Sequence, residues 1–326
     1  MEADVLDGFT VETLVLNSDY EGEVGAVLVS KKTKIKTEKA VLYIHGFADY
    51  FFNNQLADFF VEEGFDFYAL DLRKYGRAIL DHQHPNFCKD ISEYFEEIDQ
   101  AVSLIRERDL HSYLIINGHS TGGLTSSLYC HDRRNNNTIN GLLLNSPWFD
   151  INESWLVKHI VMKLTYAIGR IFPYSIAPKG LDANYARSLY KENFVEYKKK
   201  IGVYEEGLWD FNTVWKSTGK FPVYRGFLRA VRRGQKRLHR GLDIACPVLL
   251  LCSDKKGKRT NMMMPHYFNS DCVLNPDHML KYIDGIGENI KHTIIKDGMH
   301  DLALSQKAVR EKYFEEVRRW LQAHNQ

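Results

Sequence analysis

The sequence predicts an α/β fold in which a mostly parallel, doubly wound sheet carries a helical cap insertion. Three observations support this fold class. Apolar runs alternate with helical segments through the first 147 residues, as in parallel sheets covered by helices on both faces. The alternation fails over 148–240 and resumes with the apolar run 246–254, "CPVLLLCSD". The length of 326 residues suits one such domain with an insertion.

The predicted strands fall into two groups. Residues 9–16 and 22–30 alternate between polar and apolar side chains, which predicts an antiparallel strand pair. Most of the other strands are continuous apolar runs, typical of strands buried on both faces of a sheet. In chain order these runs span 40–46, 65–73, 113–117, 139–147 and 246–254. The segment 290–300, "IKHTIIKDGMH", is predicted as a last strand.

Apolar residues at helical spacing predict the helices that separate these strands. Asp90 is suited to cap the helix expected over 90–108, because its side chain can accept a hydrogen bond from a free backbone N–H group. The other helices are expected over 49–64, 123–134, 278–287 and 308–324.

The break in the alternation divides the chain into a core and an insertion. Residues 1–147 and 241–326 form the predicted core, whereas 148–240 contain helical patches, aromatics and glycines without a convincing buried strand. We interpret 148–240 as a helical cap over the end of the sheet where ligands bind.

Two segments of the cap have more than one interpretation. The segment 155–172, "WLVKHIVMKLTYAIGRIF", is too charged to span a membrane. It is interpreted as an amphipathic helix covering the core, and the alternative is an acyl-binding or weakly lipid-contacting surface. The basic run 227–241, "FLRAVRRGQKRLHRG", is interpreted as a solvated cap helix. Attraction to anionic lipid or to an acidic substrate is its alternative.

Composition argues against several classes of function. With 43 Lys+Arg and 42 Asp+Glu the net charge is +1, so the chain lacks the field of a nucleic-acid-binding protein. The five cysteines are odd in number and form no C-x-x-C pair, so we predict free thiols in a reducing compartment, without disulfides or zinc. The N-terminus does not resemble a signal peptide, and a cytoplasmic location is predicted.

A sharp turn is predicted between the strand over 113–117 and the helix after it. Glycines lie two residues before and two residues after Ser120 in "GHSTGG". Such a strand–turn–helix arrangement requires small neighbours and exposes the central serine at the carboxyl end of a strand. The following helix N-terminus directs free N–H groups toward developing negative charge. We therefore predict that Ser120 is a nucleophile.

A serine nucleophile needs a base, and the base needs an orienting carboxylate. In this arrangement the chain order is serine, acid, histidine. His300 follows the last predicted strand and is the expected base. Asp271, Asp254 and Asp277 all follow the strand over 246–254, and Asp271 is preferred among the three.

The oxyanion site requires two N–H donors. One is expected from Thr121, directly after the nucleophile, and the other from the backbone of Phe47 in "HGFADY". Water can hydrolyse the resulting acyl-enzyme, so no cofactor or metal is required. "DHQH" over 81–84 lacks a third ligand and is not interpreted as a metal site.

At this point the sequence resembles a known family. The segments "YIHGFADY", "YALDLRKYGR", "GHSTGG", "SDCVLNPDHM" and "GMHDLALS" are similar to those of α/β-hydrolases of the monoacylglycerol lipase and lysophospholipase type, which are grouped with serine aminopeptidases. The resemblance implies that Asp271 is the acid, His300 the base, and Phe47 and Thr121 the oxyanion donors. The resemblance extends over nearly the whole chain. One departure from the family is the long connection over 253–270, between the predicted strand and the expected acid.

The function predicted from these features is hydrolysis of a small-molecule carboxylic ester, with a monoacylglycerol or lysophospholipid implied by the resemblance. One alternative is a serine aminopeptidase, for which Glu205 and Glu206 are candidate amine-binding residues. Proline-releasing aminopeptidases typically have tryptophan after the nucleophile, where this chain has Thr121. The other alternative is a non-catalytic ligand-binding homologue, although a binding protein has no need of a base.

Overall fold

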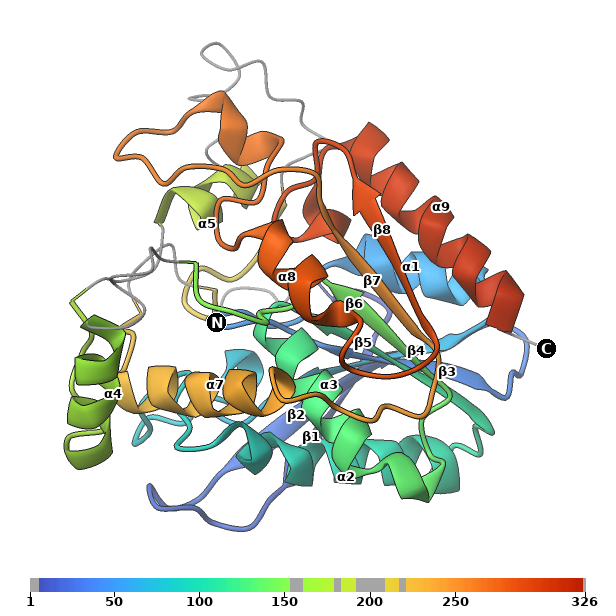
Figure 1. Ribbon diagram of the computed structural model, residues 1–326. Coiled ribbons are helices and arrows are strands. Elements are labelled where there is room, and N and C mark those ends of the chain that lie inside the picture. The colour runs from blue at the N-terminus through green and yellow to red at the C-terminus, as the bar shows by residue number, and fades with distance from the viewer. Residues whose placement is uncertain (1–5, 153–160, 179–182, 192–208, 217–220, 325–326) are drawn as a thin grey trace.

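The computed structural model describes residues 6–152, 161–178, 183–191, 209–216 and 221–324. An eight-stranded sheet runs through it in the order β1-β2-β4-β3-β5-β6-β7-β8 (Figure 1). The pairs β1–β2 and β2–β4 are antiparallel, and the other neighbours are parallel. The predicted α/β class is therefore confirmed. The strands are β1 (Thr10–Val15), β2 (Gly25–Lys31), β3 (Lys39–Ile44), β4 (Asp66–Asp71), β5 (Tyr113–His119), β6 (Gly141–Asn145), β7 (Val248–Ser253) and β8 (Ile290–Ile295).

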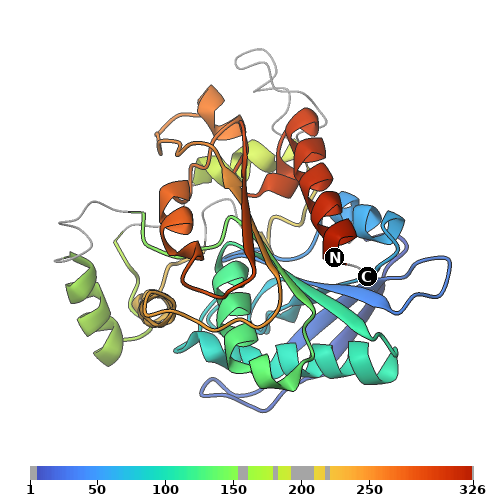
Figure 2. The same ribbon diagram turned by 45° about the vertical axis from the view of Figure 1, so that its right-hand side comes forward.

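Helices cover both faces of the sheet (Figures 1 and 2). The helices α1 and α9 lie on one face, and α2, α3 and α8 lie on the other. This is the doubly wound arrangement that strict alternation of strand and helix predicts. The described helices are α1 (Asn54–Glu62), α2 (Phe95–Ser103), α3 (Thr121–Asp132), α4 (Met162–Ile171), α5 (Ala183–Leu189), α7 (Arg225–Leu238), α8 (Pro276–Ile283) and α9 (Lys307–His324).

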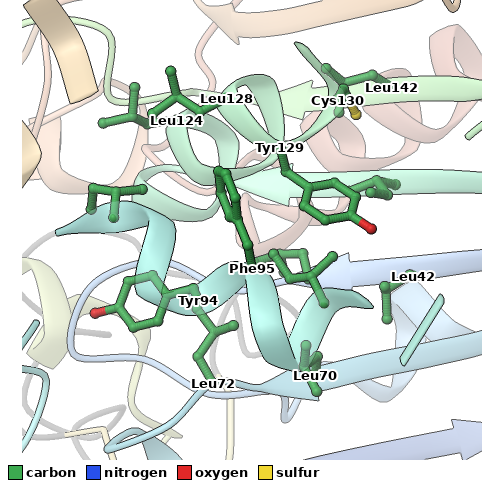
Figure 3. Packing of buried hydrophobic residues seen from close by; sticks show 14 of the residues in the cluster. Leu42, Leu70, Leu72, Tyr94, Phe95, Leu124, Leu128, Tyr129, Cys130 and Leu142 are labelled. Atoms are coloured by element: carbon green, nitrogen blue, oxygen red, sulfur yellow. The ribbon is translucent and has the colours of Figure 1, made fainter. Parts of the chain in front are cut away.

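The two faces of the sheet form two separate hydrophobic clusters. In β3, Val41 and Tyr43 pack into the cluster under α1 and α9, whereas Leu42 and Ile44 pack into the opposite one. Part of the opposite cluster is seen in Figure 3, where the ring of Phe95 from α2 lies beside Tyr129 of α3 above the leucines of the strands. Burial on both sides explains why the central strands are continuous apolar runs rather than alternating ones.

Two predicted helices begin or end differently from the expectation. The segment 90–108 opens as a 3₁₀ turn over Ile91–Tyr94, continues as α2 and ends in a π-helical turn over Leu104–Arg108. Asp90 caps it as predicted, accepting from the N–H of Ser92 at 3.1 Å. The helix expected from residue 49 begins only at Asn54, because Asn53 caps it by accepting from the N–H of Leu56 at 3.2 Å and the N–H of Phe51 donates to Asp71 at 3.0 Å.

The described parts of 148–240 contribute α4, α5 and α7. Helix α7 packs firmly on the core, since its Phe227, Ala230 and Val231 are buried in the same cluster as the α3 side chains. Residues 155–160 of the helix predicted over 155–172 lie outside the described residues, and α4 begins at Met162. The division at 148–240 stays a proposal. No helix in the described part of the chain is long and apolar enough to cross a membrane.

We predict that Leu250→Ala reduces the free energy of unfolding by about 2–5 kcal/mol, because the residue is fully buried in β7 and its removal leaves a cavity. Urea unfolding followed by circular dichroism measures the change. Leu164→Ala in α4 is the matched control: its side chain is exposed, so the expected change is within about 0.5 kcal/mol. Similar losses in both variants would contradict the assigned core.

Candidate active site

Ser120 occupies a strained position between β5 and α3. Its backbone has φ 53° and ψ −115°, in the left-handed half of conformational space where a non-glycine residue is strained. A Cβ on Gly118 would lie 2.7 Å from the carbonyl oxygen of Gly122, and one on Gly122 would collide with the carbonyl oxygen of Ile44. The glycines around Ser120 are therefore required by the close approach of neighbouring backbone, as the sequence predicts.

His300 connects Ser120 to Asp271. The imidazole Nε2 lies 3.0 Å from the hydroxyl of Ser120, and Nδ1 lies 2.9 Å from Oδ2 of Asp271. All three side chains are buried. With Nδ1–H donating to the carboxylate, Nε2 presents its lone pair to the serine O–H. This is the geometry in which an imidazole can accept the hydroxyl proton.

The carboxylate of Asp271 is fixed by its own loop. Its Oδ1 accepts from the backbone N–H groups of Val273 at 2.9 Å and Leu274 at 2.7 Å, which leaves Oδ2 directed at His300. The two alternatives considered from the sequence lie elsewhere. Asp254 is exposed and accepts from the backbone N–H of Asp297 at 2.8 Å. Asp277 is exposed in the first turn of α8.

The loop that carries His300 is held by residues that sequence reasoning did not select. Asn145, at the end of β6, donates to Oδ1 of Asp301 at 2.7 Å and accepts from the N–H of Leu302 at 3.2 Å. The N–H of Asp301 donates to the hydroxyl of Tyr185 in α5 at 3.1 Å. Their positions in the sequence could have indicated them: Asn145 ends the strand β6, and Asp301 directly follows His300.

His119, interpreted from the sequence as a packing residue, lies beside His300 with 4.9 Å between the ring centroids. Burial lowers the pKa of His119, although Asp301 acts in the opposite direction. With Nδ1 within 3.1 Å of the carbonyl oxygen of Asn145, the neutral ring donates there and is fixed in place.

The two predicted oxyanion donors lie beside Ser120. Thr121 is the first residue of α3, whose initial N–H groups have no acceptor within the helix. The loop containing Phe47 approaches from β3, and a Cβ on Gly46 would lie 3.1 Å from the Cβ of Ser120. Phe47 is held by its ring, which stacks on Phe227 of α7 with 4.3 Å between centroids. Both donor residues line the same cavity as Ser120 and His300.

A buried ion pair connects this loop to the insertion. Lys216 Nζ lies 2.5 Å from Oδ1 of Asp49, and both side chains are at most 8% exposed. Burial opposes ionisation of Asp49, but the charge and hydrogen bond of Lys216 prevail and lower the pKa of the carboxyl group. Nearby, Tyr50 accepts a hydrogen bond from the backbone N–H of Asn212 at 2.7 Å. The segment 209–216 is therefore attached to the loop after β3, which contains Phe47, Asp49 and Tyr50.

The cavity above Ser120 has a volume of about 390 Å³, within the usual range for small-molecule sites. Much of its lining is apolar and comes from the described parts of the insertion, including Val161, Met162, Val223, Phe227 and Leu228. Such a lining suits an acyl chain or an aromatic acid. Among the described residues, no group of three or more His, Cys, Asp or Glu side chains is placed to hold a metal ion.

The open, mostly parallel sheet with its serine turn has the α/β-hydrolase fold. A family model described as Hydrolase_4, "Serine aminopeptidase, S33", matches residues 35–255. The chain belongs to this hydrolase family, and the resemblance to hydrolases of the monoacylglycerol lipase type is confirmed.

Solved structures of lipases and esterases are similar to the chain. A soluble variant of monoglyceride lipase from Saccharomyces cerevisiae, in complex with a substrate analogue, has 16% identity over 99% of each chain and a TM-score of 0.69. Monoacylglycerol lipase from Paleococcus ferrophilus has 17% identity over 97% of this chain and 99% of its own, with a TM-score of 0.63.

A malate-bound esterase from Thermogutta terrifontis has 16% identity over 97% of this chain and 100% of its own, with a TM-score of 0.58. At these identities the similarities establish the fold. No curated protein sequence matches the chain significantly.

We predict that Lys216→Met reduces the free energy of unfolding by about 3–5 kcal/mol, because it leaves the Asp49 carboxylate buried without its counter-charge. The double variant Asp49→Asn/Lys216→Met should recover much of that loss, since no isolated charge remains. Chemical denaturation of the single and double variants measures both effects.

The exposed pair Lys191–Asp210, at 3.5 Å in the same insertion, provides the matched control. Lys191→Met is expected to change the free energy of unfolding by less than about 1 kcal/mol. Additive losses from Asp49→Asn and Lys216→Met would show that the buried pair does not connect the two segments.

Proposed function

We propose that the protein is a serine hydrolase that cleaves carboxylic esters through an acyl-enzyme. The observation that carries the proposal is the hydrogen-bonded series Asp271–His300–Ser120, buried at the base of a largely apolar cavity. A hydroxyl that only filled a turn would need neither an imidazole at 3.0 Å nor a carboxylate behind that imidazole.

In the proposed mechanism, Ser120 Oγ attacks the ester carbonyl while its proton passes to Nε2 of His300. Asp271 holds Nδ1–H and stabilises the imidazolium that forms. The N–H groups of Thr121 and Phe47 bind the oxyanion. Collapse of the tetrahedral intermediate expels the alcohol, which takes the proton from His300. Water then attacks the acyl-enzyme by the same route and regenerates free Ser120.

The proposed substrate is a small ester with an aliphatic or aromatic acyl group, such as a monoacylglycerol or lysophospholipid. The apolar residues of α4 and α7 that line the cavity support this choice. Weak contact of the cap with a lipid surface is supported by Leu164, Ile171 and Phe172, which are all more than 60% exposed in or directly after α4. The five free, buried cysteines support a reducing, cytoplasmic location.

An aminopeptidase would need an anionic group to hold the substrate's amine. The acidic side chain among the described lining residues is Asp49, which is paired with Lys216. Glu205 and Glu206, the candidates from the sequence, lie outside the described residues. The cavity therefore supports an ester more than a free N-terminal amine.

We predict that the purified protein hydrolyses p-nitrophenyl esters and that Ser120→Ala lowers kcat by a factor on the order of 10⁶. A series of acyl lengths should show an optimum set by the cavity, because chains longer than the lining pass into solvent. Release of p-nitrophenolate measures both results.

Ser127→Ala is the control, since Ser127 donates to the Gly123 carbonyl within α3 and is not among the lining residues of the cavity. It should retain activity within a few-fold of the wild type. Equal turnover by wild type and Ser120→Ala would refute the proposed nucleophile. Absence of turnover on every ester would refute ester hydrolysis and direct the assay to aminoacyl substrates.

A further inference from the structure

The cavity over Ser120 carries an uncompensated positive charge. Besides histidines, its described lining includes three charged side chains, Asp49, Lys216 and Arg259. Asp49 and Lys216 neutralise one another at 2.5 Å. Within the described ranges, no carboxylate lies within ion-pairing distance of the guanidinium of Arg259. One cation therefore remains at the rim of an otherwise largely apolar site.

The backbone on both sides of Arg259 is fixed by hydrogen bonds. Nε2–H of His266 donates to the carbonyl of Lys258 at 2.6 Å. On the other side, the N–H of Thr260 donates to the hydroxyl of the buried Tyr267 at 3.0 Å, and the Thr260 carbonyl accepts from Asn184 of α5 at 2.7 Å. These bonds fix the backbone on both sides of Arg259, whose exposed side chain lines the cavity.

The same loop is attached to the proposed acid. The N–H of Gly257 donates to the carbonyl of Asp271 at 2.7 Å, and the N–H of Asp271 donates to the carbonyl of Lys255 at 3.0 Å. A Cβ on Gly257 would collide with Sγ of Cys272, so the two segments pack closely. The long connection over 253–270 is thus hydrogen-bonded to the backbone of Asp271, and Arg259 follows two residues after Gly257, where this contact ends.

We propose that Arg259 binds an anionic oxyacid group, a carboxylate or a phosphate, on the ester substrate. This inference rests on the proposed ester hydrolysis and specifies the substrate class. A guanidinium offers planar, paired N–H donors that match both groups. The preferred substrate then has an apolar group that lies along α4 and α7 and an anionic group that lies near Arg259. A neutral ester contacts the apolar lining but makes no ion pair with Arg259.

A neighbouring lysine of the same loop provides a control that distinguishes binding of an anion at Arg259 from general electrostatic attraction by the loop. Lys255 is paired with Asp297 at 2.5 Å, whereas Lys258 is exposed, adjacent to Arg259 and not among the residues that line the cavity. Lys258→Gln therefore removes one positive charge from the same loop without altering the cavity. It is the matched control for Arg259→Gln.

The test compares anionic and neutral esters of the same acyl length. One pair is mono-4-nitrophenyl adipate and 4-nitrophenyl hexanoate, which places a carboxylate on the acyl side. The other is hexanoyl lysophosphatidate and monohexanoylglycerol, which places a phosphate on the alcohol side. The measured quantity is the ratio of kcat/KM for the anionic ester to kcat/KM for its neutral partner.

We expect at least one pair to show an anionic preference in the wild type, and that pair identifies the bound group. Arg259→Gln should lower its ratio about 10- to 100-fold, the usual effect of losing a charge-assisted hydrogen bond. Lys258→Gln should leave the ratio within two-fold. Unchanged ratios in Arg259→Gln, or equal losses in both variants, would overturn the inference.

A binding measurement keeps this test independent of turnover. Trp148 lines the cavity, so its fluorescence can report binding of the four esters to Ser120→Ala and to Ser120→Ala/Arg259→Gln. Tighter binding of an anionic ester that disappears with Arg259 supports the inference even if no ester is hydrolysed. Equal binding of anionic and neutral partners overturns it, whereas absence of hydrolysis overturns only the proposed function.

Discussion

The hydrogen bonds from Asp271 through His300 to Ser120 are the constraint on which the rest of the site depends. His300 is 29 positions from Asp271 and 180 positions from Ser120 along the chain, yet its imidazole lies 2.9 Å from the carboxylate and 3.0 Å from the hydroxyl. Ser120 directly follows β5, Asp271 lies on the loop after β7, and His300 lies on the loop after β8. Because the carboxyl ends of parallel strands share one edge of a sheet, the parallel arrangement is what brings them together.

Two pairs of buried polar side chains hold the loops around the site. Asn145 and Asp301 hold the loop of His300, and Asp49 with Lys216 holds the loop after β3 that contains Phe47. An unpaired polar group in these positions would carry a large desolvation penalty, so each pair favours a single arrangement. The described residues of 148–240 contribute Lys216, the partner of Asp49, and much of the apolar lining of the cavity. They therefore contribute to the geometry of the site as well as to its enclosure.

Much of the fold follows from local sequence, because strands buried on both faces must be continuous apolar runs. The turn at Ser120 is equally local, since the close backbone contacts of Gly118 and Gly122 exclude larger residues. Asp271 was preferred from the sequence, but what holds it in place was not predictable, because its backbone is hydrogen-bonded to Lys255 and Gly257 in a return of the chain that no local pattern records. Pairings such as that of Asp49 and Lys216 join residues 167 positions apart and follow from tertiary packing alone.

The most direct test is the rate at which a serine-directed phosphonate labels the protein, with the modified residue located by mass spectrometry. Labelling requires an activated serine but no knowledge of the substrate. The account predicts modification of Ser120, slowed about 10⁴-fold by Asp271→Asn, which misdirects the imidazole, and unchanged within two-fold by Asp254→Asn. Modification of another residue, or equal rates in wild type and Asp271→Asn, would contradict it.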